Sequence, residues 1–119
     1  MNQYEVTALI AEELPEADKD LPYLAALGNL NRTMSILSLY TKQMIVAHNF
    51  RQVQKCMQLA DSIYRRGNAV VKKAVENIFV FSFSFMRLSC NKVEWHIAQA
   101  KIPGSLYSVY MKQVMQSSC

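Results

Sequence analysis

Four basic side chains and an asparagine gather within nine residues and form the best candidate for a binding site. In the stretch RRGNAVVKK, Arg65 and Arg66 precede a glycine and Asn68, and Lys72 and Lys73 follow. Asparagine often caps helices, so a helix is expected to begin after Asn68, with both lysines in its first turn. Because that end of a helix attracts anions, four cations there predict an answering anion. This anion would be a partner's carboxylate, a phosphate or an acidic segment of the chain; the alternative is that the side chains extend into water, which screens their repulsion.

Residue types that carry catalysis or bind metals are few and scattered. His48 and His96 have no second ligand three or four residues away, and the HExxH pattern does not occur. Cys56, Cys90 and Cys119 are well separated and form no CxxC pair. We therefore expect no metal site, no cofactor and no enzymatic activity. The separated cysteines indicate free thiols in a reducing compartment, with Cys56 buried as a structural side chain.

Charge divides the chain into an acidic start and a basic remainder. Residues 1–20 hold six acidic side chains and one lysine, a net charge of −5, whereas residues 21–119 have a net charge of +9. Three interpretations are open: the acidic arm docks on the basic body, the body meets an anionic partner, or the charges belong to the solvated faces of amphipathic helices. Nucleic acid is not the expected partner, because the cations are dispersed and no known reading motif occurs.

The composition favours a single helical domain away from the membrane. The chain has 119 residues, 51% of them hydrophobic, but only three glycines and three prolines. So few chain breakers favour long helices over a sandwich or barrel. No apolar run is long enough to span a membrane, and the first residues lack the basic region of a secretory signal. These features predict a cytoplasmic, all-α domain over residues 1–119, with an acidic N-terminal helix and linker (1–20) and a basic helical body (21–119).

Capping residues and apolar spacing set the expected helix limits. Pro15 should end the first helix, and Asp20 should cap the second. Asn49 and Asn68 should cap later helices, and Gly67 should adopt the left-handed conformation that often ends a helix. The expected helices span residues 2–14, 21–48 with a break near 28–31, 50–66, 69–88, 92–100 and 103–116. These five or six helices should pack as antiparallel hairpins around the buried 69–88 helix.

The segment FVFSFSF, residues 79–85, raises the one conflict over secondary structure. Its phenylalanines occupy every second position, which is typical of a half-buried strand. No other segment alternates in this way, however, so a strand would have no partner for its backbone hydrogen bonds. No chain breaker interrupts the preceding residues either. We therefore expect a helix that is apolar around most of its circumference and buried at the centre of the domain.

Two stretches resemble a known family. They are CMQLADSIYRRGNAVVKKAVENIFVFSFS and IPGSLYSVYMKQV, within residues 49–114. The chain is similar here to a family of small, all-helical bacterial domains of unknown function, found often in Bacteroidetes. The matching residues are Cys56, Ala60, Asp61, Tyr64, Gly67, Asn68, Glu76, Asn77, Phe79 and Phe81. The resemblance implies a helical fold and contributes no catalytic residue. Some relatives resemble immunity proteins that neutralise a toxin.

These observations lead to one functional hypothesis and three alternatives. We expect a non-enzymatic protein-interaction domain whose partner binds the basic corner, defined as residues 65–73. An immunity-like role is one form of this hypothesis. The first alternative is a small-ligand domain with a pocket rich in Met and Phe, near Phe81, Phe85 and Trp95. The second is nucleic-acid binding. The third is an enzyme that uses polar groups of the 69–88 helix, namely Glu76, Asn77, Ser82 and Ser84.

Overall fold

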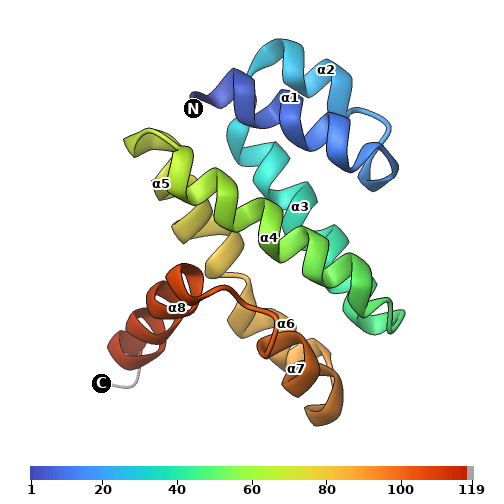
Figure 1. The fold of residues 1–119 in the computed structure, drawn as a ribbon, viewed down its shortest axis with the longest axis vertical. Helices are drawn as coiled ribbons and strands as arrows, with labels where there is room; N and C mark the ends of the chain where they lie inside the picture. The colour runs from blue at the N-terminus through green and yellow to red at the C-terminus, as the bar shows by residue number, and fades with distance from the viewer. Residues whose placement is uncertain (118–119) are drawn as a thin grey trace.

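Helices and short connections account for all of residues 1–117, which are the residues that the computed structural model describes (Figure 1). The elements are α1 (Gln3–Glu13), the 3₁₀ turn η1 (Pro15–Ala17), α2 (Leu21–Leu27), α3 (Leu30–Val46), α4 (Phe50–Arg66), α5 (Ala69–Ala74), the π-helical η2 (Val75–Val80), α6 (Phe83–Ser89), α7 (Lys92–Gln99) and α8 (Gly104–Ser117). The expected all-α class is confirmed. If α5, η2 and α6 are counted as one nearly continuous helix, residues 1–117 contain seven helices, slightly more than the five or six expected. None of them is long and apolar enough to cross a membrane. Cys119 lies outside the described residues.

Asparagine side chains start five of the helices. Each accepts a hydrogen bond from the backbone N–H three residues later, which stabilises the helix by about 1 kcal/mol. These caps are Asn2, Asn29, Asn49, Asn68 and Asn91. The caps expected at Asn49 and Asn68 are therefore confirmed. The cap expected at Asp20 is wrong, because its side chain makes no capping hydrogen bond. Instead, the backbone N–H of Asp20 donates to Oδ1 of Asp18 at 2.8 Å.

Two glycines allow close packing at helix junctions. Gly28 breaks the second expected helix, as predicted, and has a left-handed φ of +62°. A Cβ atom on Gly28 would lie 2.5 Å from the ring of Tyr4. Gly67 was expected to be left-handed, which is wrong, because its φ of −76° and ψ of 152° are extended. Gly67 is needed for space, since a Cβ atom there would lie 2.4 Å from Cγ1 of Val71.

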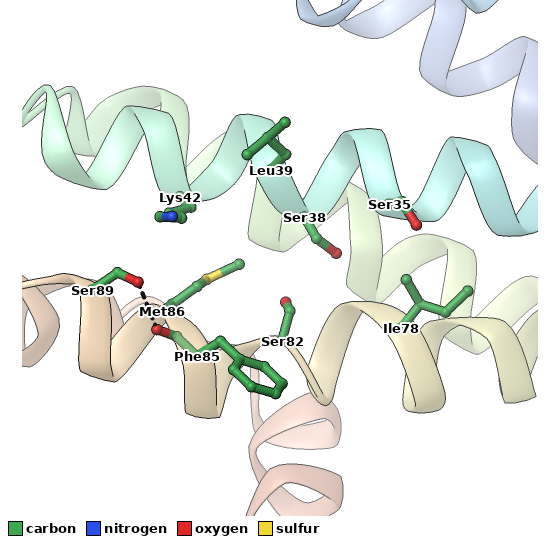
Figure 2. A pocket seen from close by; sticks show the side chains of 9 residues that line it. All are labelled: Ser35, Ser38, Leu39, Lys42, Ile78, Ser82, Phe85, Met86 and Ser89. Carbon is green, nitrogen blue, oxygen red and sulfur yellow. Dashed lines mark hydrogen bonds between the residues drawn. The ribbon is translucent and has the colours of Figure 1, made fainter.

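Three helical segments form the centre of the fold. Helices α3 and α4 and the π-helical η2 each contact the other two. The chain reverses direction after α3 and again after α4, so α3 and the segment from α5 to α6 run parallel, side by side (Figure 2). Helices α1 and α2 pack together, and α1 also packs on α3, whereas α8 packs on η2 (Figure 1).

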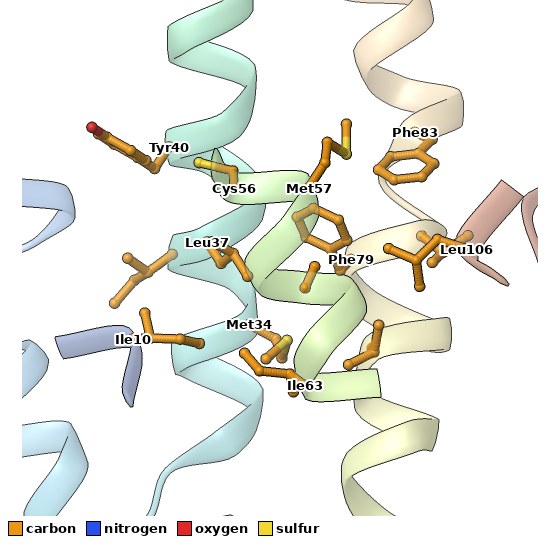
Figure 3. Packing of buried hydrophobic residues seen from close by; sticks show 14 of the residues in the cluster. Ile10, Met34, Leu37, Tyr40, Cys56, Met57, Ile63, Phe79, Phe83 and Leu106 are labelled. Carbon is orange, nitrogen blue, oxygen red and sulfur yellow. The ribbon is translucent and has the colours of Figure 1, made fainter. Parts of the chain in front are cut away.

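The core joins these segments through fully buried side chains. Figure 3 shows Leu37 of α3, Met57 of α4 and Phe79 of η2 packed together, with Leu106 of α8 beyond Phe79. Ile10 of α1 reaches the opposite side of α3. One continuous core therefore holds all layers, and removing a large side chain from it would cost about 3 kcal/mol or more.

The segment from α5 to α6 is helical, as predicted, but it is buried on one side only. Phe79 and Phe83 are fully buried, whereas Phe81 and Phe85 are 51% and 59% exposed. Residues two apart lie on opposite sides of a helix, because each residue turns the chain by roughly 100°. The expectation that this segment is buried around its circumference is therefore wrong, and alternate phenylalanines divide between core and solvent.

One carbonyl of the π-helical turn η2 accepts two hydrogen bonds, and one of them is a tertiary contact. The N–H of Phe81 donates to the carbonyl of Glu76 at 3.2 Å, five residues back. The same carbonyl accepts a hydrogen bond of 2.9 Å from Nε2 of Gln113. The wider turn therefore helps to attach α8 to the central segment.

Replacing Gly28 with alanine should destabilise the domain by about 1–3 kcal/mol, because the left-handed backbone and the Tyr4 ring both exclude a Cβ atom. Urea unfolding followed by circular dichroism measures this change. Gly104→Ala is the matched control, since nothing lies within 4 Å of its added Cβ atom. Equal stability of the two variants would contradict the packing of Tyr4 against this turn.

Candidate functional site

The basic corner is partly neutralised within the chain. Nε of Arg65 lies 3.1 Å from Oδ2 of Asp61. Nζ of Lys72 donates to the carbonyl of Tyr64 at 2.9 Å and lies 5.0 Å from the centre of its ring. Lys72 and Lys73 occupy the fourth and fifth positions of α5, beyond the N–H groups that the first turn leaves free. The prediction that Arg65 and Lys72 need an external anion is therefore wrong, because both side chains are engaged within the chain.

The remaining corner residues have different roles. The side chain of Asn68 caps α5 by accepting from the N–H of Val71 at 3.0 Å. Arg66 and Lys73 are exposed, and neither side chain forms an ion pair within residues 1–117. Of the five residues predicted to bind an anion, only these two present a charged group that has neither an ion pair nor a hydrogen bond within residues 1–117.

The acidic arm docks on the body, and its first residue reaches the corner. The N-terminal amine of Met1 donates to the carbonyl of Arg66 at 2.7 Å, and the backbone N–H of Asn68 donates to the carbonyl of Met1 at 2.9 Å. The carboxylate of Glu16 bonds elsewhere. Oε1 of Glu16 accepts hydrogen bonds from the Tyr40 hydroxyl at 2.8 Å and from Nε2 of Gln52 at 2.9 Å. The backbone N–H of Glu16 and the Tyr40 hydroxyl together hold the pKa of this carboxyl below its ordinary value. Lys55 donates to the carbonyl of Glu13 at 2.9 Å. These bonds tie the arm to α3 and α4, and no ion pair among residues 1–117 joins it to the corner cations.

A partly buried tyrosine–carboxylate bond lies beside the corner. The hydroxyl of Tyr64 donates to Oε2 of Glu76 at 2.5 Å and so joins α4 to η2. The neighbouring carboxylate, followed by burial, raises the pKa of Tyr64 to about 12. Glu76 thus serves an internal contact and is not presented to a partner.

A groove lies between α3 and the segment formed by η2 and α6 (Figure 2). Its volume is about 280 Å³. The lining combines small hydroxyl groups, apolar side chains and one cation, and it consists of Ser35, Ser38, Leu39, Lys42, Ile78, Ser82, Phe85, Met86 and Ser89. Because the two walls are parallel helices, the groove follows their common direction.

The hydroxyl groups of this groove are already used as donors. Each serine donates to a carbonyl of its own helical segment three or four residues earlier, and the acceptors lie in Asn31, Met34, Phe79 and Phe85. The lining contains no histidine or carboxylate that would activate a serine. Its chemistry is therefore that of a binding surface with apolar contacts, oxygen acceptors and a lysine.

A second hollow continues the groove toward the start of both helices. It has a volume of about 370 Å³ and is lined by Asn31, Val70, Lys73, Ala74, Asn77 and Ile78. Ile78 belongs to both hollows. We call the lining residues of the two hollows together the seam groove. It carries Lys73 toward one end and Lys42 toward the other, and no Asp or Glu is among its lining residues.

The predicted ligand pocket does not form. Trp95 is buried against Phe83 and Tyr110, with ring centres 6.1 and 6.3 Å apart. Phe81 and Phe85 instead pair with each other at the exposed side of the same segment, at 5.6 Å. Trp95 borders a different hollow from Phe85. The three aromatic residues therefore belong to two surfaces, because alternate phenylalanines point in opposite directions.

The cysteines within residues 1–117 do not have the surroundings of reactive thiols. Cys56 is fully buried, as predicted, and burial raises the pKa of its thiol. Burial also raises the pKa of Cys90, which is partly exposed. Reactive cysteines require the opposite shift. The described residues contain no group of three or more potential metal ligands among His, Cys, Asp and Glu.

Most of the seam groove was missed by sequence reasoning. Lys73 and Phe85 were proposed as site residues, but for two separate sites. The available signal was the spacing of Ser35, Ser38 and Ser82, small residues on helices that later proved to be neighbours. That signal becomes informative only once the parallel arrangement of the helices is known.

Replacing Tyr64 with phenylalanine should reduce the loss of stability at high pH. The folded protein holds the Tyr64 proton up to about pH 12, whereas the ordinary pKa is 10.0, so its contribution is present below pH 10 and is lost as the pH rises toward 12. Urea unfolding at several pH values should show a fall smaller by about 1–2 kcal/mol in the variant.

Burial also raises the pKa of Tyr40, but that effect is common to both proteins and cancels in the comparison. Tyr23→Phe is the control, because Tyr23 is 66% exposed. Identical pH slopes in wild type and Tyr64→Phe would contradict the importance of the bond to Glu76.

Comparison with known proteins places the chain in a family without assigning it an activity. No curated protein and no solved structure matches the chain significantly. A family model described as a domain of unknown function matches residues 7–116, which include both helices of the seam groove and the whole basic corner. This chain therefore belongs to the DUF7674 family, whose function is unknown.

Proposed function

We propose that this domain is a non-enzymatic protein-interaction module whose partner binds in the seam groove. The observation that carries the proposal is a trough between two parallel helices, lined by exposed apolar side chains and by cations without ion pairs in residues 1–117. Leu39, Val70 and Phe85 are each more than half exposed. Lys42 and Lys73 supply the charge.

Apolar exposure on this scale is a cost unless a partner covers it. The ring of Phe81 packs against Phe85 and extends the apolar surface beyond the groove. Contiguous apolar surface with a polar or charged edge is characteristic of interaction sites. The presence of these exposed apolar side chains beside a groove therefore favours a role in binding.

The basic corner contributes the edge of this surface rather than its centre. Lys73 lines the groove, whereas Arg65 and Lys72 are engaged inside the chain. An immunity-like role in the bacterial cytoplasm is the specific form of the proposal. It is supported by the resemblance of residues 49–114 to small bacterial domains.

A photo-crosslinking amino acid placed at Leu39 or Phe85 should form adducts with a partner in a lysate of the native source. The same amino acid at Tyr23, an exposed position on α2, should not form them. Mass spectrometry of the adducts identifies the partner. Because all three positions are more than half exposed, the substitutions should change stability by only about 0.5 kcal/mol.

Two results would contradict the groove as the binding surface. One is that adducts form equally at Leu39, Phe85 and Tyr23, which would indicate nonspecific contact. The other is that no adduct forms at either groove position. Thermal unfolding of each labelled protein shows that the comparison is made between folded domains.

A further inference from the structure

We infer that the seam groove binds an amphipathic α-helix of about three turns that carries acidic residues near both ends. This inference rests on the proposed function, because it names the kind of partner that the groove accepts. It follows from three properties of the groove: the length of its walls, the state of its polar groups and the sign of its charge.

The length of the walls suits a short helix. On α3 the lining extends from Asn31 to Lys42. Eleven residues of helix rise by about 16 Å, which is about three turns. On the other wall the lining extends from Val70 to Ser89 and passes through the π-helical turn, which contributes Asn77 and Ile78. A partner helix bound along the groove would contact both walls, α3 on one side and the α5–α6 segment on the other.

An extended partner fits less well. A strand would need an exposed sheet edge for its backbone hydrogen bonds, and residues 1–117 contain no strand. A proline-rich segment would need a series of aromatic side chains along the groove, whereas Phe85 is the only aromatic residue among the lining residues. A helix satisfies its own backbone and requires from the groove only space and side-chain contacts.

The hydroxyl groups of the lining permit apolar contacts. The four serines donate internally, so covering them leaves no hydroxyl donor without a partner. Serine and Ala74 are also small, which leaves room for larger side chains from a bound helix. Apolar residues at positions i, i+3 or i+4, and i+7 of the partner would contact Leu39, Ile78 and Phe85.

The charge of the groove selects acidic partners. Lys42 and Lys73 stand toward opposite ends, and the lining has no carboxylate to oppose them. The hollow beside the groove, which shares Ser35 and Leu39 with it, contributes one acid and one base, Asp18 and Arg32, and so adds no net charge. Acidic residues about three turns apart on one helix would each reach a lysine, whereas a basic helix would be repelled.

A peptide display library tests the inference directly. Random peptides of about sixteen residues, enough for three helical turns with flanks, are selected on the wild-type domain. They are then counter-selected on the double variant Leu39→Glu and Phe85→Glu, in which the groove carries acids. We expect groove-dependent peptides with apolar residues at helical spacing and Asp or Glu near both ends.

Charge variants then test the role of the lysines. The double variant Lys42→Gln and Lys73→Gln should weaken the selected peptides by about tenfold. The matched variant Arg65→Gln and Lys72→Gln removes the same charge outside the groove and should leave affinity unchanged. Binding should also weaken as salt rises from roughly 0.05 to 0.5 M, because exposed ion pairs are screened. Circular dichroism and thermal unfolding confirm that each variant is folded, and the lysine variants serve for counter-selection if the acidic variant does not fold.

The outcomes separate this inference from the proposed function. Groove-dependent peptides that are basic or rich in proline would overturn the acidic helix but leave the groove as a protein-binding surface. Equal binding of the selected peptides to wild type and to the Lys42→Gln and Lys73→Gln variant would also overturn the acidic helix and leave the groove as a protein-binding surface. Selected peptides that all ignore the groove variants would overturn both. A concentration-dependent dimer in sedimentation, lost in the groove variant, would assign the groove to a second copy of the chain and overturn the inference.

Discussion

The arrangement of the whole domain depends on α4 covering one side of a parallel pair of helices. Helix α3 and η2 contact each other, and both contact α4, with Leu37, Met57 and Phe79 buried between them. Parallel neighbours require a returning element, and α4 is that element. It fills one side of the seam between the two helices, and the other side remains open as the seam groove. The core and the candidate binding surface therefore arise from the same packing constraint.

The alternating phenylalanines let one helical segment serve both surfaces. Phe79 and Phe83 enter the core, where Phe83 meets Trp95 and Tyr110, while Phe81 and Phe85 point outward. A strand would achieve the same division by its pleat, but here the roughly 100° turn per residue achieves it. The sequence pattern of a half-buried strand is thus compatible with a half-buried helix when the apolar run is short.

Local chemistry made the helix ends predictable, and tertiary packing made the site unpredictable. Asparagine caps and the glycine break depend on a few adjacent residues, so the limits of α4 and the break at Gly28 were found from the sequence. The conformation predicted for Gly67 was wrong because glycine is required there by the space next to the Val71 side chain, and not by a left-handed backbone. The groove could not be found in this way, since its walls are about forty residues apart and its exposure depends on which side α4 covers.

The electrostatics of the corner show why charge clusters in sequence overstate binding. Asp61 lies one helical turn before Arg65 and pairs with it, and Lys72 folds back to the carbonyl of Tyr64 near the end of α4. The acidic arm meanwhile places Glu16 against Tyr40 and Gln52, and the groove lysines have no ion pair among residues 1–117. The cations available to the proposed partner in the groove are consequently Lys42 and Lys73, whereas Arg65 and Lys72 are engaged within the chain. Ala74 and Met86 belong to both the groove and the core, whereas Leu39, Val70 and Phe85 are more than half exposed. The exposed part of the candidate binding surface can therefore change with little effect on the packing that holds it.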